Sequence, residues 1–162
     1  MKKLFAFLVA AIVSIGVAHA EAPEPGNFAA GINFNYGNLT ESFGFGIRGQ
    51  YTIINNLRGE VAVNYFTKHK GVKAWDVNIN AQYLVALWSD KLFIYPLAGL
   101  NYTMATFNEE GIKDEENHVG LNLGAGAEYS ITENVNLFLE YRHTIERKID
   151  QGVFALGATY RF

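Results

Sequence analysis

The feature that most constrains this chain is a repeated alternation between large apolar residues and small or polar residues. In the first run, Phe28, Ile32 and Phe34 share one face, whereas Asn33 and Asn35 share the other. A period of two is typical of β-strands, because successive side chains point to opposite faces. The same pattern predicts eight strands, at Asn27–Tyr36, Phe43–Ile53, Leu57–Tyr65, Trp75–Leu87, Leu92–Phe107, Val119–Tyr129, Val135–Arg142 and Phe154–Phe162.

The connections between these predicted strands alternate in length. We expect tight turns at 54–56, 89–91 and 132–134, and longer loops at 38–42, 68–73, 108–117 and 147–151. Short turns at one end and longer loops at the other are typical of an antiparallel up-and-down barrel in a membrane. With eight strands, the first strand begins and the last strand ends on the side of the short turns.

The two faces of the strands determine whether such a barrel meets water or lipid. One face carries Phe, Tyr, Trp, Ile and Leu, and the other carries Gly, Ala, Asn, Gln and charged residues. An eight-stranded barrel has an interior just wide enough for side chains, so the bulky set points outward, where only lipid accepts it. The sequence therefore predicts an all-β, eight-stranded transmembrane barrel. Aromatic residues near both strand ends, such as Trp75 and Tyr160, predict interfacial girdles.

The N-terminus has the three parts of a secretory signal peptide. Lys2 and Lys3 precede an apolar run at 4–17, and Ala18-His19-Ala20 forms a cleavage site. The run is shorter than the roughly 20 residues that a membrane-spanning helix needs. We therefore expect a cleaved signal peptide at 1–20, with cleavage after Ala20, a short periplasmic segment at 21–26 and the barrel at 27–162.

Charge and cysteine content exclude several kinds of protein and site. The formal net charge of −3 becomes more negative when Lys2 and Lys3 are removed, which argues against nucleic-acid binding. The chain has no cysteine and therefore no disulfide. The acidic segment Asn108–Asn117 is expected to be a solvated loop. Its carboxylates would also allow weak Ca²⁺ binding, but their spacing matches no EF-hand, and we predict no cofactor or metal site.

The inward face combines equal numbers of positive and negative residues. Charges removed from bulk water must be paired or hydrogen-bonded. A balanced set in a narrow lumen predicts an ion-pair network that plugs the barrel, whereas an open pore more often has an excess of one sign. Acid–base catalysis by paired carboxylates is the alternative, but a packed lumen leaves no cleft for a substrate. The predicted network is formed by Arg48, Arg58, Glu60, Asp76, Glu128, Glu140, Arg142 and Arg161.

The last strand carries a second signal, because apolar residues at alternate positions lead to a final aromatic residue. These are Leu156, Ala158, Tyr160 and Phe162. Together with the eight runs and the segments Tyr95–Gly99 and Leu139–Arg142, this ending resembles the OmpA/OmpX-type barrels of the Gram-negative outer membrane. The resemblance implies export through the periplasm, periplasmic chaperones, and insertion by the barrel-assembly machinery, which reads the C-terminal residues.

The resemblance says more about the fold than about the function, since one scaffold carries many activities. The favoured function is structural or surface-interacting: envelope integrity, contact with lipopolysaccharide, or contact with an external partner. The alternative is a narrow channel for ions or small solutes. We expect a monomer, because a closed barrel has no free edge. The basic residues expected to contact lipopolysaccharide phosphates are Lys68, Lys70, Lys73, Arg147 and Lys148.

A hydrolase of the same size is a third alternative. Lipid A deacylases are eight-stranded barrels with a His-x-Ser pair and a carboxylate. The nearest segment here is His143-Thr144-Ile145, in which Ile145 occupies the place of the serine. Triad chemistry needs a nucleophile, a base and an orienting group together. The sequence therefore predicts no catalytic residue and no enzyme.

Overall fold

The computed structural model describes residues 24–38, 41–69, 72–88, 91–109, 112–146 and 150–162, so the predicted signal peptide lies outside the described residues. The described residues form nine strands: β1 (Phe28–Gly37), β2 (Ser42–Ile54), β3 (Leu57–His69), β4 (Val72–Tyr83), β5 (Val85–Trp88), β6 (Leu92–Glu109), β7 (Ile112–Ser130), β8 (Val135–Ile145) and β9 (Asp150–Arg161). Within these ranges there is no helix with the length and hydropathy needed to cross a bilayer.

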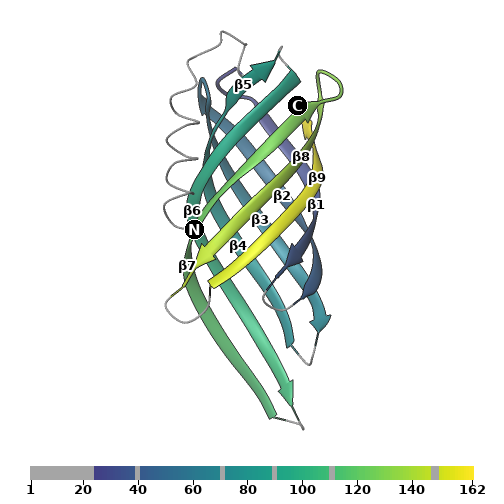
Figure 1. Ribbon diagram of the computed structural model, residues 1–162, viewed down its shortest axis with the longest axis vertical. Coiled ribbons are helices and arrows are strands. Elements are labelled where there is room, and N and C mark those ends of the chain that lie inside the picture. The colour runs from purple at the N-terminus through teal and green to yellow at the C-terminus, as the bar shows by residue number, and fades with distance from the viewer. Residues whose placement is uncertain (1–23, 39–40, 70–71, 89–90, 110–111, 147–149) are drawn as a thin grey trace.

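The strands close into one antiparallel barrel (Figure 1). Neighbours follow the order β4-β3-β2-β1-β9-β8-β7-β6-β5, and an additional pairing of β4 with β6 closes the barrel. The first and last strands are partners in the wall, with Phe34 of β1 opposite Leu156 of β9. The prediction of an all-β, eight-stranded antiparallel up-and-down barrel is confirmed. The short strand β5 is present in addition to those eight strands.

The extra strand arises because the predicted strand Trp75–Leu87 is interrupted at Leu84. The main-chain N–H of Leu84 donates to the carbonyl of Asn56 at 2.7 Å, and Nδ2 of Asn56 donates to the carbonyl of Leu84 at 2.8 Å. Asn56 lies in the tight turn between β2 and β3 with a φ of 73°. Asparagine tolerates this left-handed conformation better than most residues. The turn thus holds the backbone at the point where β4 ends.

Burial alternates along the strands as predicted, with the apolar face outside. On β1, Ile32 and Phe34 have 60% and 66% of their surface exposed, whereas Asn33 and Asn35 are buried. Water-soluble proteins rarely expose a continuous apolar belt around the whole molecule. The outer wall therefore has the polarity that contact with lipid requires.

The segment Asn108–Asn117, predicted to be a loop, is strand wherever the structure describes it. β6 continues to Glu109 and β7 begins at Ile112, and these two residues are paired. The prediction was wrong because it relied on apolar alternation. A strand whose residues show no such alternation can still pair through its backbone.

This hairpin reaches beyond the rest of the barrel (Figure 1). The pairing of β7 with β8 stops at Leu121. Beyond that point β7 pairs only with β6, over Ile112–Gly120 opposite Asn101–Glu109. We name these two paired segments the ribbon. The end of the barrel that carries it is the ribbon end, and the opposite end, with the tight turns, is the turn end.

Candidate functional site: the lumen and the ribbon

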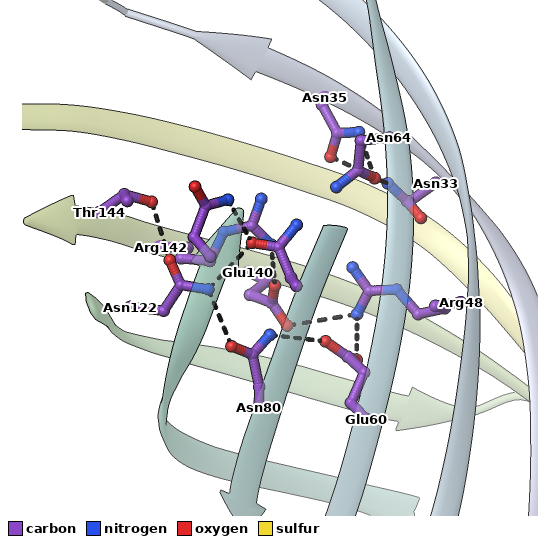
Figure 2. A network of polar contacts seen from close by, with 12 residues as sticks. Asn33, Asn35, Arg48, Glu60, Asn64, Asn80, Asn122, Glu140, Arg142 and Thr144 are labelled. Atoms are coloured by element: carbon purple, nitrogen blue, oxygen red, sulfur yellow. Dashed lines mark hydrogen bonds and ion pairs between the residues drawn. The ribbon is translucent and has the colours of Figure 1, made fainter. Parts of the chain in front are cut away.

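Arg48 lies inside the lumen and joins two carboxylates. It projects from β2, and its Nη1 donates to Glu60 of β3 at 2.9 Å and to Glu140 of β8 at 3.2 Å. All three side chains are fully buried, and Figure 2 shows them converging from different strands. The guanidinium also lies 3.8 Å from the ring centroid of Phe138, a cation–π contact. One arginine therefore compensates two buried acids in the interior.

Arg58 forms a second ion pair toward the turn end. Its Nη1 lies 2.9 Å from Oε2 of Glu128, and its Nε donates to Gln82 at 2.8 Å. The guanidinium faces the ring of Tyr95 at 5.4 Å from the centroid. Both carboxylate oxygens of Glu128 are buried and lack hydrogen-bond geometry to any described residue, so this pair is held by charge more than by directed bonds.

Arg142 is held more loosely than Arg48. Its guanidinium lies 3.8 Å from Asp76 of β4 and 3.7 Å from Glu140 of its own strand, both beyond hydrogen-bond distance. Its Nε and Nη2 atoms are buried without a hydrogen-bond partner among the described residues. The third lumen arginine thus neutralises nearby acids without fixed geometry.

The structure brings seven of the eight predicted charged residues into ion pairs and leaves Arg161 apart. Arg161 lies at the turn end of β9, and its side chain forms no ion pair with any residue that the structure describes. It borders a narrow cavity together with Gln50, Thr52 and Arg58. The sequence pattern placed Arg161 on the inward face. It did not give the register between strands, and this register separates Arg161 from the acidic residues.

A second group of inward polar residues was not singled out in the sequence. Toward the ribbon end, Asn64 accepts from Asn33 at 2.8 Å and from Asn35 at 3.0 Å, and it donates to Asp76 at 2.7 Å. Figure 2 shows the cluster of Asn33, Asn35 and Asn64 near Arg48. The signal in the sequence that could have revealed this group is the recurrence of asparagine at inward positions. A neutral amide there can both donate and accept hydrogen bonds.

The amide contacts continue around the barrel wall. Asn122 of β7 donates to Asn78 and to Asn80 of β4, each at 2.9 Å, and accepts from Thr144 of β8 at 2.8 Å. Asn80 in turn donates to Glu60 at 3.1 Å. We name these inward asparagines the amide layer: Asn33, Asn35, Asn64, Asn78, Asn80 and Asn122. The amide layer and the ion pairs form one connected network, so a change on one strand affects the neighbouring strands.

Apolar side chains fill the lumen toward the turn end. A buried cluster there consists of Leu84, Ala86, Phe93, Tyr95 and Leu97. The Tyr95 hydroxyl donates to Glu140 at 3.0 Å, which connects this cluster to the ion pairs. A narrow barrel thus accepts some aromatic residues inside, provided that they come from only a few strands.

The predicted C-terminal assembly residues lie on the outer wall. Leu156, Tyr160 and Phe162 have 57%, 49% and 72% of their surface exposed, and Ala158 is half-buried between them. Phe162 contacts the ring of Phe28 at a centroid distance of 5.8 Å and the ring of Tyr160 at 5.1 Å. These aromatic residues form part of a girdle at the turn end.

Of the predicted lipopolysaccharide contacts, Lys73 is the residue whose side chain the structure describes. It is exposed near the start of β4, at the ribbon end. Lys68 belongs to β3 by its backbone. Lys70, Arg147 and Lys148 lie outside the described residues.

The segment compared with a His-x-Ser pair does not converge on one point. Thr144 is buried in the lumen, where it donates to Asn122, whereas Ile145 has 42% of its surface exposed on the outer side. His143 shares the outward face with Ile145, as the alternation of a strand requires. The position of the serine is therefore an outward-facing isoleucine, and the Thr144 hydroxyl lies on the opposite face of the strand from His143.

Comparison with known proteins identifies the family. Residues 5–162 match the family described as outer membrane protein beta-barrel domain. The chain is 26% identical to Outer membrane protein X of Escherichia coli K12 over 156 residues, covering 93% of this chain and 84% of that protein.

Two solved structures are similar in fold. The N-terminal β-barrel domain of OprF from Pseudomonas aeruginosa has a TM-score of 0.75 at 17% identity, covering 85% of this chain and 98% of that one. Ail, the attachment invasion locus protein of Yersinia pestis, has a TM-score of 0.64 at 17% identity, covering 85% and 99%. With the family match spanning nearly the whole sequence, this chain belongs to the outer membrane protein beta-barrel domain family and resides in the outer membrane.

Proposed function

We propose that the protein is a surface-interaction protein, in which a plugged barrel anchors the ribbon outside the cell. The observation that carries this proposal is that, among the described residues, one edge of β7 is unpaired in the ribbon. It is the edge opposite to the one that pairs with β6. Over Ile112–Gly120, β7 has no partner strand on that edge within the described part of the chain. An unpaired edge presents main-chain N–H and C=O groups to any extended segment that can add as a further strand.

The sequence of the ribbon indicates which partner would fit. Lys113 is followed by Asp114, Glu115 and Glu116, so the free strand is acidic. Charged residues on an edge strand discourage pairing between identical copies, because like charges would face each other. We infer that the partner is an extended peptide segment rich in Lys or Arg.

The interior supports the role of an anchor instead of a channel. Buried ion pairs, amides and aromatic side chains lie inside the barrel at several levels between its two ends. The C-terminal residues on the outer wall support insertion by the barrel-assembly machinery after export with a cleaved signal peptide. The related fold of Ail belongs to a protein whose name refers to attachment and invasion, which is also a surface role.

Contact with lipopolysaccharide is the second part of this proposed role. Lys73 is exposed at the ribbon end, and Lys68 and Lys70 are close to it in sequence. Cations at this level of an outer-membrane barrel can pair with phosphates of the outer leaflet. Such contacts would tie the barrel to the leaflet and support envelope integrity.

The test of the ribbon uses a fluorescent ten-residue peptide of alternating Lys and Val, titrated onto the refolded barrel in phosphatidylcholine nanodiscs. We expect fluorescence anisotropy to report binding of the peptide. In the shortened variant, an Asn-Gly turn replaces residues 107–114 and joins Thr106 to Glu115, which are opposite each other in register. The affinity of this variant for the peptide should be more than tenfold lower. The shortened edge loses several main-chain bonds of about 1 kcal/mol each.

Two controls separate strand pairing from charge attraction. A Lys-Val peptide that is N-methylated at every second residue keeps its charge but lacks donors on one edge, and it should bind as weakly as the shortened variant. The triple variant Asp114→Asn, Glu115→Gln and Glu116→Gln should retain pairing but lose the preference for Lys-Val over Thr-Val peptide. Equal binding of both Lys-Val peptides would overturn the proposal.

A further inference from the structure

The outer wall carries a hollow of about 330 Å³ on the face of β2, β3 and β4. Its side-chain walls are Phe45, Ile47, Val63, Tyr65 and Trp75, and we name it the aromatic hollow. Every one of these side chains is more than one-third exposed on the lipid-facing side.

Strand register explains why the wall is hollowed at this point. Phe45 lies opposite Tyr65, and Tyr65 lies opposite Trp75, which forms an aromatic row across three strands. In the next outward-facing row toward the turn end, Val63 lies opposite Ile47 of β2 and Val77 of β4, so a row of aliphatic side chains follows the row of rings. The rings of Phe45 and Tyr65 tilt together with centroids 5.6 Å apart. Aliphatic side chains are shorter than the rings beside them, so the boundary between the two rows forms a trough on the lipid-facing wall.

The cation Lys73 lies on the headgroup side of this trough. Lys73 precedes Trp75 by two residues on β4, so it shares the outward face at a rise of about 6–7 Å toward the ribbon end. It is exposed and forms no ion pair within the described ranges of the chain. Tyr and Trp mark the level of the membrane interface, so the cation lies where phosphates of that leaflet lie.

The geometry points to a lipid site: we propose that the aromatic hollow binds an acyl chain of the lipid A part of lipopolysaccharide, with Lys73 pairing with its phosphate. This inference rests on the proposed orientation, in which the ribbon faces outward and the hollow lies in the outer leaflet. An acyl chain buries the exposed rings, and the phosphate compensates the unpaired cation. An anionic phospholipid, phosphatidylglycerol, is the competing occupant in the experiment below.

A second hollow on the wall provides an internal control. It has about 260 Å³ and is lined by Leu57, Tyr83, Pro96, Ala98 and Leu123, toward the turn end. In the proposed orientation this second hollow faces the periplasmic leaflet. A filling substitution there, Ala98→Phe, is the matched counterpart of Val63→Phe in the aromatic hollow.

The chain itself supplies the reporter for this site. It has two tryptophans, so Trp88→Phe leaves Trp75, which lines the hollow, as the sole tryptophan. The refolded Trp88→Phe barrel in phosphatidylcholine nanodiscs is titrated with lipid A that carries a nitroxide on one acyl chain. We expect saturable quenching of Trp75 at about one lipid per barrel, and about fivefold weaker binding for Lys73→Gln or for lipid A without phosphates.

The filling variants decide whether the hollow is the site. Val63→Phe should abolish the saturable quenching, and Ala98→Phe should leave it unchanged. Equal quenching by nitroxide-labelled phosphatidylglycerol, or quenching that persists in Val63→Phe, would overturn the proposal. Co-sedimentation with lipopolysaccharide vesicles distinguishes the site in the hollow from the lipopolysaccharide contact in the proposed function. If the barrel co-sediments but Trp75 is not specifically quenched, the site in the hollow alone is refuted. If the barrel neither co-sediments nor shows specific quenching, the proposed lipopolysaccharide contact is refuted as well.

Discussion

Replacing Arg48 with methionine should lower the free energy of unfolding by about 3–5 kcal/mol, the range expected when a buried ion pair loses one partner. Methionine fills the space of the aliphatic stem but offers no donor to Glu60 or Glu140, both of which remain buried. Amides still donate to Glu60, so the loss should be at the lower end of that range. Urea unfolding of the barrel in phosphatidylcholine vesicles, followed by tryptophan fluorescence, measures it.

Two comparisons separate lost pairing from lost packing. Lys73→Met removes an exposed cation and should change the free energy of unfolding by less than about 0.5 kcal/mol. Adding Glu60→Gln and Glu140→Gln to Arg48→Met removes the charges left behind and should recover more than half of the loss. If Arg48→Met alone lost less than about 1 kcal/mol, these residues would not form a buried ion pair in the membrane.

A single methyl group at Gly99 should destabilise the barrel by about 3 kcal/mol, at the upper end for overpacking. A Cβ at this position would collide with the main-chain carbonyl of Ile79 and with the side chain of Asn80 on the adjacent β4. Asn80 has little freedom to move, because it donates to Glu60 at 3.1 Å and accepts from Asn122 at 2.9 Å. The same urea titration on Gly99→Ala measures the loss.

Gly59→Ala is the matched control for Gly99→Ala. A Cβ at Gly59 would have as its nearest neighbours a side-chain carbon of Ile53 at 3.5 Å and the carbonyl oxygen of Tyr51 at 4.0 Å, which are ordinary contacts. The free energy of unfolding of this variant should lie within about 0.5 kcal/mol of that of the native chain. Identical unfolding of Gly99→Ala and Gly59→Ala would show that the lumen is wider than described.

The sequence predicted the barrel and the two faces of its strands because one physical rule governs both. Each strand meets lipid on one side and a narrow polar interior on the other, so alternation is enforced residue by residue. The rule is weakest in β6, where Phe93, Tyr95 and Leu97 point inward and are themselves apolar. It also fails over Asn108–Asn117, where the backbones of β6 and β7 pair although the sequence shows no apolar alternation.

Partners inside the lumen could not be predicted from alternation. Which inward residues meet depends on the stagger of all the strands around the barrel. Arg48 and Glu140 are 92 residues apart in sequence, yet they meet at 3.2 Å. Arg161 has the same inward position on its strand, but the register places it away from the acids. The amide layer was overlooked because asparagine also fits turns and loops, so its recurrence on one face was not given weight.

The most direct test of the account is the electrical conductance of the refolded barrel in a planar bilayer. Insertion would be verified by recovery of the barrel from the membrane, and a large porin would serve as the positive control. We predict no discrete current steps, because buried ion pairs, amides and aromatic side chains lie inside the barrel. Steady, discrete steps would show a continuous water path past Arg48 and Glu140, and they would contradict the proposal that the barrel is a plugged anchor for its outer surface.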